Sequence, residues 1–454
     1  MTLVFFWTDA LVWLLVAMLG GFLFYVRGRE HLRRPWRKIL ADPAAMASLT
    51  VLLAFGAIGV LDSLHFQFTD PQAENGNEPL SLLDVALTPL RSRDEKTYSA
   101  PLAWRSYSRE TLGGNGVVLR DYPRLQYGGA QLADPENQWA GNVVLRGGLG
   151  LLGGLALWAC GLGARVLFPS PRGRGVRGEG HLSSGSAVTL TALILCLLAG
   201  LLTGLASGYH PLGTDKVGQD VLYQSLKSIR TGLVIGTLTT LVMLPFALLL
   251  GMLAGYFRGL ADDVIQYLYT TLNSIPGVLL IAAAILVTQV YMANHEEDFA
   301  SLAARADLRL LFLCLILGLT SWTGLCRLLR AETLKLRDME FVQAARALGV
   351  SDGMILLRHI LPNVFHIVLI SVALDFSSLV LAEAVLSYIS IGVDPATHSW
   401  GNMINSARLE LARDPVVWWP LASALVFMFT LVLAANLFAD AVRDAFDPRR
   451  GGGT

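Results

Sequence analysis

Long apolar blocks alternate with short charged stretches along the whole chain. A helix needs about 20 mainly apolar residues to cross the hydrocarbon layer of a bilayer. Blocks of that length predict nine spans, at approximately 3–26, 44–64, 147–168, 187–207, 231–256, 264–291, 308–326, 366–391 and 418–440. The pattern therefore predicts an all-α polytopic membrane protein with about nine transmembrane helices.

Composition supports a membrane protein and excludes several other classes. Among 454 residues, 54% are hydrophobic and 15% are charged, below the quarter typical of soluble domains, and mean hydropathy is +0.52. The 35 basic and 35 acidic residues balance, so no nucleic-acid partner is expected. The cysteines lie in apolar stretches without metal-ligand spacing, so we expect neither a metal site nor a disulfide: Cys160, Cys196, Cys314 and Cys326.

The positions of lysine and arginine predict the orientation, because cytoplasmic loops are enriched in both. Basic residues gather after the first, third and seventh predicted spans and in the C-terminal tail: Arg27, Arg29, Arg33, Arg34, Arg37, Lys38; Arg172, Arg174, Arg177; Arg327, Arg330, Lys335, Arg337, Arg346, Arg358; Arg443, Arg449, Arg450. Nine spans place all four regions on the cytoplasmic side, with the N-terminus outside and the C-terminus inside. The run Thr2–Val26 has no basic region before it and is long enough to span, so it is not an ordinary signal peptide.

Two polar stretches divide the chain. Residues 65–141 predict an external loop or small domain, turn-rich at Gly113-Gly114-Asn115-Gly116, and long loops escape the charge rule. Residues 169–186 are rich in Gly, Arg and Ser and predict a flexible cytoplasmic linker. We therefore expect an N-terminal extension, 1–186, with about three spans, followed by a six-span domain, 187–449.

The loop 327–365, between the seventh and eighth predicted spans, has the pattern of a helix-turn-helix. Its first helix has apolar positions at helical spacing: Leu334, Phe341, Ala345 and Leu348. Gly349 suits the left-handed position after a helix end, and Ser351 or Asp352 can cap the next helix. That helix has apolar positions at Ile355, Leu356 and Ile360, and Pro362 suits the first turn of the following span. On pattern alone, a helix pair lying on the membrane surface remains an alternative.

The amino-acid sequence of this loop is more informative than its pattern of apolar positions. Gln343-Ala344-Ala345, then Gly349, then Arg358-His359-Ile360-Leu361-Pro362-Asn363 resembles the EAA loop of ABC importer permeases in spacing throughout. Gln343 stands in place of Glu and His359 in place of Ile, as in the dipeptide/oligopeptide branch. The resemblance implies a coupling helix that docks on a cytoplasmic ATPase, with these coupling residues: Gln343, Ala344, Ala345, Gly349, Asp352, His359 and Pro362.

A second stretch also resembles the C-type peptide permease subunit. It runs His210-Pro211-Leu212-Gly213-Thr214-Asp215 and then Gly218-Gln219-Asp220. We expect Thr214 or Asp215 to cap an amphipathic interfacial helix with a face of Val217, Val221, Leu222, Ser225 and Ile229. Receiving the binding protein or gating is one role for this motif, and merely anchoring a loop is the other.

Acidic residues inside a span are costly, at about 2.5–3.5 kcal/mol each on insertion scales, and usually face a bundle interior or a wet cavity. Asp375 and Glu383 lie in the eighth predicted span, and 381–388, which includes Ser387, resembles a family stretch. We interpret these three as pathway candidates, with a hydrogen bond between helices as the rival for Glu383. In the sixth predicted span, Ser274-Ile275-Pro276 predicts a kink.

The resemblance covers about 187–449, up to Ala441–Pro448, and implies a type I importer core of six spans. It implies a homologous second permease subunit, two ABC ATPase subunits that bind ATP and a periplasmic solute-binding protein, with this chain in the bacterial inner membrane. Relatives of this kind carry dipeptides, oligopeptides, peptide-like antibiotics or nickel chelates. The chain has no G-x-x-x-x-G-K-[ST] loop, so we expect no cofactor on it and no catalysis by it.

Two other classes compete with an importer subunit. An ion-coupled secondary transporter or channel would use Asp375 and Glu383 as ion sites, but no matching broken helices are evident in two halves. An intramembrane enzyme would need a catalytic pair, and His295-Glu296-Glu297-Asp298 contains no H-E-x-x-H motif. Co-purification of ATPase subunits would separate the importer from both.

Overall fold

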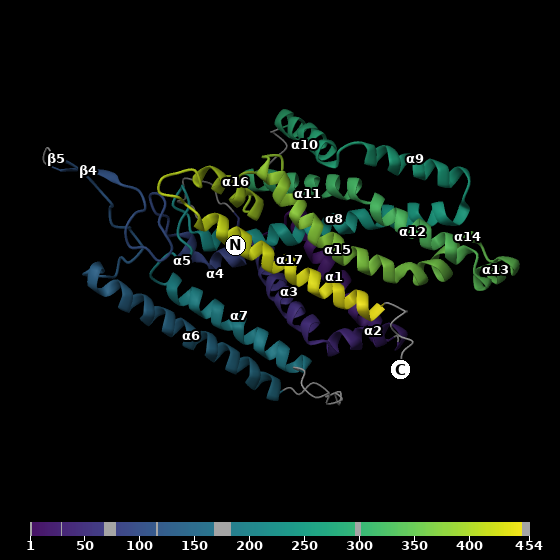
Figure 1. Ribbon diagram of the computed structural model, residues 1–454, viewed down its shortest axis with the longest axis horizontal. Helices are drawn as coiled ribbons and strands as arrows, with labels where there is room; N and C mark the ends of the chain where they lie inside the picture. Colours follow the sequence, from purple (N-terminus) through teal and green to yellow (C-terminus); the bar gives the residue numbers. More distant parts are fainter. Residues whose placement is uncertain are drawn as a thin grey trace. The chain divides into compact units, whose positions relative to one another are not determined.

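The structure, a computed structural model, describes residues 2–28, 30–67, 79–114, 117–167, 183–295 and 301–446. Its longer helices are α1 (Trp7–Arg27), α3 (Pro43–Asp62), α6 (Pro135–Leu167), α7 (Ser184–Ala206), α8 (Val221–Phe257), α10 (Gly277–Asn294), α11 (Leu302–Ser321), α15 (Leu361–Tyr388) and α17 (Trp419–Phe446). Its shorter ones are α2 (Glu30–Ala41), α4 (Leu82–Ala86), α5 (Thr88–Arg91), α9 (Leu260–Ser274), α12 (Thr323–Arg337), α13 (Glu340–Ala347), α14 (Asp352–Ile355), the π-helix η2 (Leu356–Ile360) and α16 (Trp400–Glu410) (Figure 1).

Seven helical stretches within the described residues are long and apolar enough to cross a membrane. They are Pro43–Asp62, Pro135–Gly163, Ser184–Ala206, Val221–Phe257, Gly277–Asn294, Asp352–Tyr388 and Trp419–Phe446. Each overlaps one of the predicted spans. The all-α polytopic membrane class is therefore confirmed.

The two other predicted spans, 3–26 and 308–326, are also helical but weaker as membrane spans. The described apolar run of α1 is Trp7–Phe22, which is short for a crossing. Helix α11 carries Arg305, Asp307 and Arg309 near its start, which lowers its hydropathy. The two helices contact each other, and the backbone N–H of Thr8 donates to Asp307 Oδ2 at 3.2 Å.

The predicted sixth span, 264–291, is wrong as a single helix. The helix is interrupted at Ile275 and Pro276, which separate the amphipathic helix α9 from the apolar helix α10. Ile275 is extended, with φ −90° and ψ 130°, because the ring of the following proline excludes the helical conformation. The expected kink is thus a full break, and only α10 has the composition of a span.

The described helices form two compact units that interleave along the chain. Unit 1 comprises Met1–Val4, Leu40–Thr231 and His398–Ala434, and unit 2 comprises Phe5–Ile39, Gly232–Thr397 and Ala435–Thr454. Buried apolar side chains of α8, α12, α13, η2 and α15 make one core in unit 2. The division into 1–186 and 187–449 concerns family likeness and stays a prediction.

Glycines bring α6 and α7 together within unit 1, where the two helices run side by side (Figure 1). A Cβ on Gly150 or Gly154 would overlap the carbonyl oxygen of Gly200 or Cys196, and a Cβ on Gly204 would lie 2.6 Å from the carbonyl oxygen of Arg146. The spacing of four residues on both helices is the small-xxx-small pattern of close helix pairs in membranes. The contact therefore depends on the absence of side chains.

The predicted external region, 65–141, contains short strands as well as turns. β1 (Thr2–Val4), β2 (His65–Gln67) and β3 (Leu80–Ser81) make an antiparallel sheet, and β4 (Glu110–Gly114) pairs with β5 (Val117–Asp121). Trp139 Nε1 donates to the carbonyl oxygen of Leu102 at 2.8 Å and ties the loop to the start of α6. The described residues of this region, 65–67, 79–114 and 117–141, thus fold together within unit 1.

Some predictions fall on residues outside those that the structure describes. They concern most of the linker 169–186 with its arginines, the acidic residues of 296–298, Asn115 and Gly116 of the turn-rich stretch, and the tail from Asp447 onward.

Replacing Gly150 with Leu should destabilise the protein by about 1–3 kcal/mol, because the new side chain must push two helix backbones apart. We expect a lower unfolding midpoint in detergent. Gly148→Leu is the matched control, since a Cβ at Gly148 meets no atom within 4 Å. Equal midpoints for the two variants would show that α6 and α7 do not pack closely.

Candidate coupling loop and external motif

The turn between the two arms of the loop 327–365 is a regular helix C-cap. Helix α13 ends at Ala347, and Gly349 takes a left-handed φ of +76°. The N–H of Val350 donates to the carbonyl of Ala345 at 3.1 Å, and the N–H of Gly349 donates to the carbonyl of Arg346 at 3.0 Å. This pair of bonds is a Schellman motif, which fixes the direction of the chain leaving the helix. The predicted conformation of Gly349 is confirmed.

The predicted apolar face of the first arm is partly wrong. Val342 and Ala345 are buried in the core of unit 2, but Phe341 is 43% exposed and Leu348 is 83% exposed. In the second arm, the predicted apolar positions Ile355, Leu356 and Ile360 are all buried. Spacing alone did not separate the two faces, because both carry apolar side chains.

The exposed side chains form what we call the apolar patch of the loop. Its members are large hydrophobic residues that α13, α14, η2 and the turns beside them leave uncovered: Met339, Phe341, Leu348, Met354 and Leu357. Charged residues interleave with it, including Glu340, Arg346 and Arg358. An exposed apolar patch rimmed by charges is typical of a surface that docks another protein.

The second arm continues directly into a span. α14, η2 and α15 follow without a break, so Asp352–Tyr388 is one helical stretch. Leu361 N–H donates to the carbonyl of Leu356, five residues back, which makes this turn a π turn. Pro362 lies in the first turn of α15, as predicted, and its missing N–H and ring account for the local widening. A force on the loop therefore reaches the span through continuous helix.

Tyr256, near the end of α8, contacts residues on both arms of the turn at Gly349. Its hydroxyl donates to Asp352 Oδ1 at 2.5 Å, and the Arg346 guanidinium lies 5.1 Å from its ring centre. This tyrosine is buried at 1% exposure, whereas Asp352 is exposed. The contact gives Asp352, predicted as a helix cap, a partner that is 96 residues away in sequence.

Two ion pairs tie α12 and the turn after it to neighbouring segments. Arg330 binds Asp262 of α9 through Nε–Oδ1 at 2.5 Å and Nη2–Oδ2 at 2.7 Å, and its guanidinium holds the pKa of Asp262 below the ordinary value. Arg258 Nη2 donates to Asp338 Oδ2 at 2.8 Å. The bidentate pair is the stronger of the two because its geometry fixes both groups and it is less exposed.

The remaining predicted coupling residues lie on the surface of the same loop. Gln343 Nε2 donates to the carbonyl of Asp338 at 3.1 Å, and Ala344 is exposed beside it. His359 lies 6.4 Å from the ring of Phe341, between ring centres, and its carbonyl accepts from Asn363 Nδ2 at 2.7 Å. The structure thus brings the predicted residues into one loop, while their roles stay predictions.

The external motif is a compact loop in unit 1 and is not helical. His210 Nδ1 lies 2.7 Å from Asp220 Oδ2, and His210 Nε2 lies 3.6 Å from Glu95 Oε1. Glu95 also accepts backbone N–H bonds from Gln126, Tyr127 and Gly128, at 2.8, 2.8 and 3.0 Å. All three charged groups are buried.

These contacts shift two pKa values in opposite directions. Burial lowers the pKa of His210, but the hydrogen bond with Asp220 and the negative charges of Asp220 and Glu95 outweigh it and raise the pKa to about 9. Burial raises the pKa of Glu95, but the nearby His210 ring and the hydrogen bonds from the three backbone N–H groups bring the pKa down to about 2. Both groups are therefore charged at neutral pH and stabilise each other.

The other residues of the motif fasten it to the segment 97–99 and to α17. The Ser99 N–H donates to Thr214 Oγ1 at 2.7 Å, and Trp419 Nε1 donates to the Thr214 carbonyl at 2.9 Å. Gly213 and Gly218 take φ of +76° and +88°, and a Cβ on Gly218 would overlap Glu95. Pro211 is buried next to His210. The glycines are needed both for their backbone conformation and for close approach.

The predicted interfacial helix is wrong. Residues 214–220 form a turn closed by an antiparallel β-bridge between Thr214 and Asp220, and helix α8 begins at Val221 and continues as a span. Asp220 caps it, since its Oδ1 accepts the N–H groups of Leu222 at 2.8 Å and Tyr223 at 3.2 Å. Asp215 instead accepts the N–H groups of Val217 and Gln219, both at 2.9 Å, within its own turn. Val217 is exposed, whereas Val221, Leu222, Ser225 and Ile229 are buried.

The pathway candidates of α15 differ in their surroundings. Glu383 is 2% exposed and accepts from the hydroxyl of Ser387, itself buried, at 2.7 Å. That bond lies within α15 and is not a hydrogen bond between helices, so both roles considered for Glu383 stay predictions. The Asp375 carboxylate is half-buried, and no hydrogen-bond or ion-pair partner for it lies among the described residues. Asp375 therefore fits a wet lining better than Glu383 does.

Several residues of this architecture could not be identified from the sequence. Glu95, Tyr256 and Lys227 each join segments distant in the chain; Lys227 Nζ donates to Asp62 Oδ1 at 2.7 Å and to Asp84 Oδ2 at 3.0 Å. A lysine near the start of a span is an ordinary interface anchor in sequence. The residues next to Lys227 in the sequence give no indication of its buried carboxylate partners.

Several membrane spans and a loop with an exposed apolar patch are features of a membrane permease, and comparison with known proteins identifies the class. The family model of the binding-protein-dependent transport system inner membrane component matches residues 247–452. The chain is 33% identical over 239 residues to the oligopeptide transport system permease protein OppC of Mycobacterium bovis, which covers 53% of this chain and 76% of that protein. The chain therefore belongs to the family of binding-protein-dependent transport system inner membrane components.

Two further relatives agree with this assignment. The glutathione transport system permease protein GsiD of Pectobacterium atrosepticum is 31% identical over 244 residues, covering 54% of this chain and 74% of that protein. The dipeptide transport system permease protein DppC of Lactococcus lactis is 29% identical over 240 residues, covering 53% and 64%. The resemblance to C-type permeases is confirmed: the protein is a multi-pass inner-membrane permease and not an enzyme, and the comparisons do not favour an ion-coupled transporter or channel.

The stability of the external motif should fall as the pH rises. His210 has its pKa raised from about 6.5 in the unfolded chain to about 9, so its contribution, at most about 3 kcal/mol, is complete below pH 6.5 and lost as the pH rises through 9. We expect the unfolding midpoint in detergent to drop between pH 7 and 9.5, and less steeply in His210→Gln. His359→Gln, in the coupling loop, should keep the wild-type slope. A wild-type slope in His210→Gln would contradict the ion-pair assignment.

Proposed function

We propose that this chain forms, with a homologous second permease subunit, the pathway by which peptides or similarly sized solutes cross the bacterial inner membrane. The substrate class rests on the names of the relatives, which are an oligopeptide, a glutathione and a dipeptide permease. All three cargoes are small peptides. Half-buried Asp375 of α15 is the side chain that we assign to the lining of this pathway.

The loop 327–365 is the docking site for an ATPase subunit. Two separate ABC ATPase subunits bind and hydrolyse ATP, one of them docks on the apolar patch, and this chain carries no nucleotide, metal or other cofactor of its own. The observation that carries this step is the apolar patch itself, with Leu348 83% exposed at the tip of a rigid glycine turn. Docking would cover side chains that are otherwise left in water.

Movement of the ATPase would then reach the membrane along rigid elements. Helix α13 is anchored by Val342 and Ala345, and Asp352 is bonded to Tyr256 at the end of α8. The second arm runs without interruption into α15, which carries Asp375. A shift of the loop therefore displaces α15 and α8 together, as alternating access requires.

The outer face receives solute from a periplasmic solute-binding protein. The external motif and the folded segment 79–141 lie next to the outer ends of α7 and α8, and the arginine-rich loops lie on the opposite side by the charge rule. This orientation places the coupling loop and the C-terminus in the cytoplasm. Membrane lipid surrounds the spans, and the balanced charge offers nothing to a nucleic acid.

Leu348→Ser should reduce capture of the ATPase about tenfold, because it removes an apolar side chain that docking would bury. The measurement is a pull-down of the tagged permease in mild detergent, with ATP hydrolysis assayed in the eluate. Leu409→Ser is the matched control, since Leu409 is 69% exposed on α16 and is not part of the loop. Both variants should keep the wild-type unfolding midpoint. Undiminished ATPase in the Leu348→Ser eluate would remove the basis for the docking surface.

The angle of the turn can be tested separately from its surface. Gly349→Val should uncouple ATP hydrolysis from solute uptake, because a β-branched residue is strained by about 1–3 kcal/mol at positive φ. Gly349→Asn should retain coupling, since Asn tolerates the left-handed region. A Cβ here meets no atom within 4 Å, so lack of space cannot explain a difference. Uptake in reconstituted vesicles is the assay, and equal coupling in both variants would refute the rigid-turn mechanism.

A further inference from the structure

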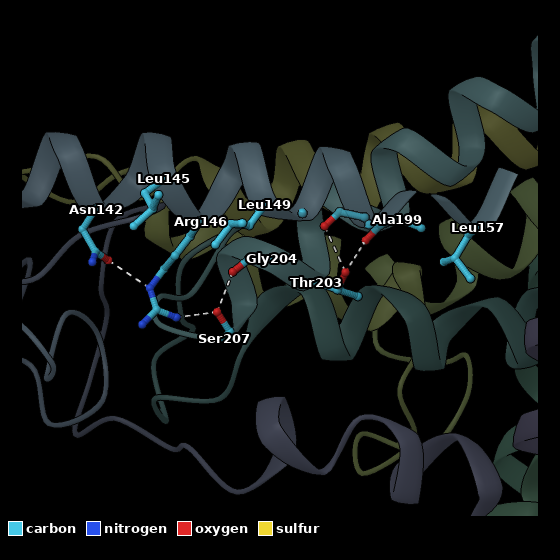
Figure 2. Close-up of a pocket in the computed structure, with 12 residues that line it drawn as sticks. Asn142, Leu145, Arg146, Leu149, Leu157, Ala199, Thr203, Gly204 and Ser207 are labelled. Carbon is cyan, nitrogen blue, oxygen red and sulfur yellow. Dashed lines mark hydrogen bonds between the residues drawn. The ribbon is translucent and has the colours of Figure 1, made fainter. Parts of the chain in front are cut away.

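A groove of about 750 Å³ runs along the contact between α6 and α7, within unit 1 (Figure 2). Its walls are mostly apolar and include Leu149, Gly153, Leu157 and Ala199. The groove exists because glycines on both helices remove side chains where the backbones approach. Figure 2 shows Arg146 toward the Asn142 end of the groove and Leu157 at the opposite end.

The groove belongs to a face that this chain leaves uncovered. Leu145, Leu149 and Leu157 are 60%, 59% and 66% exposed, and only 11% of each of the two spans is buried. Both helices are membrane spans, so an apolar groove on such a face opens toward lipid acyl chains. Water is not expected to fill the groove, because apolar walls offer it few hydrogen bonds.

One end of the groove carries a positive charge. Arg146 Nε donates to Asn142 Oδ1 at 2.9 Å, and Arg146 Nη1 donates to Ser207 Oγ. Both acceptors are neutral, and no carboxylate pairs with Arg146 within the described part of the chain. The positive charge is thus held in place by hydrogen bonds but is not neutralised.

This charge lies at the end of the α7 span. Helix α7 ends at Ala206, Ser207 follows it, and Arg146 contacts that end. The apolar walls, from Leu149 to Leu157 and Ala199, begin one turn further along α6 and α7. A cation at the membrane interface above an apolar groove is complementary to a molecule with an anionic head and a hydrocarbon tail.

We propose that this groove is a binding site for one anionic glycerophospholipid. Its phosphate accepts hydrogen bonds from the Arg146 guanidinium, which Asn142 and Ser207 hold in place, and one acyl chain lies along Leu149, Gly153 and Leu157. The lipid fills the space between α6 and α7 that the glycines leave open and neutralises Arg146. The site is a structural lipid site, separate from the solute pathway and from the coupling loop.

The test uses the full-length chain purified in its transporter complex. Gly153→Leu fills the groove, since a Cβ at Gly153 meets no atom within 4 Å, and Gly148→Leu adds the same side chain to α6 where it does not line the groove. Arg146→Gln removes the charge, and Arg146→Lys retains it. After delipidation, native mass spectrometry measures binding of added phosphatidylglycerol and, in a parallel titration, phosphatidylcholine.

We expect wild type, Gly148→Leu and Arg146→Lys to prefer phosphatidylglycerol, with a matching rise in unfolding midpoint. Gly153→Leu should lose the bound lipid, and Arg146→Gln should lose the preference for the anionic lipid by about five- to tenfold. Wild-type lipid binding in both Gly153→Leu and Arg146→Gln would overturn the proposal. So would loss of the second permease from the Gly153→Leu complex with lipid binding intact, because the groove would then hold a helix of that subunit.

Discussion

The close approach of helix backbones at glycine is the constraint on which the rest of this structure depends. Hydrocarbon offers helices no hydrophobic reason to associate, so contact area between them must supply the attraction. Gly251 and Gly255 let α8 lie against α12 so closely that an added Cβ would meet the carbonyl oxygens of Cys326 and Arg330 at 2.8 and 2.7 Å. Since α12 carries the first arm of the loop 327–365, the position of that loop is set where α12 packs against α8, by two missing side chains.

The parts of the fold that sequence predicts well are those determined by neighbours in the chain. Apolar runs locate the spans, and the C-cap at Gly349 follows from a single residue type at a helix end. The errors have a common physical origin. Phe341 and Leu348 look like core residues because apolar side chains serve equally well to fill a core and to dock a partner, and only the folded loop shows that Val342 and Ala345 occupy the inner face.

The external motif illustrates the limit more sharply. Its sequence predicts a residue that caps the next helix. Whether Asp220 or Thr214 caps α8 depends on the other groups to which each side chain is bonded. Thr214 is already bonded to Ser99, 115 residues earlier, and Asp220 shares His210 with Glu95. Such choices are set by tertiary partners that no local spacing encodes. For the same reason the sequence predicts the coupling residues by family likeness but gives no indication of Tyr256, which bonds to Asp352 from 96 residues away.

The π turn before Pro362 has a consequence for the angular phase of α15. It holds one residue more than an α-helical turn, so every side chain after Leu361 is rotated by about 100° from where an uninterrupted helix would place it. That single extra residue determines that Glu383 points into the protein and which way Asp375 faces. Gain or loss of one residue at 356–360 would thus reorient every face of the span, without altering the turn at Gly349 or the apolar composition of the span.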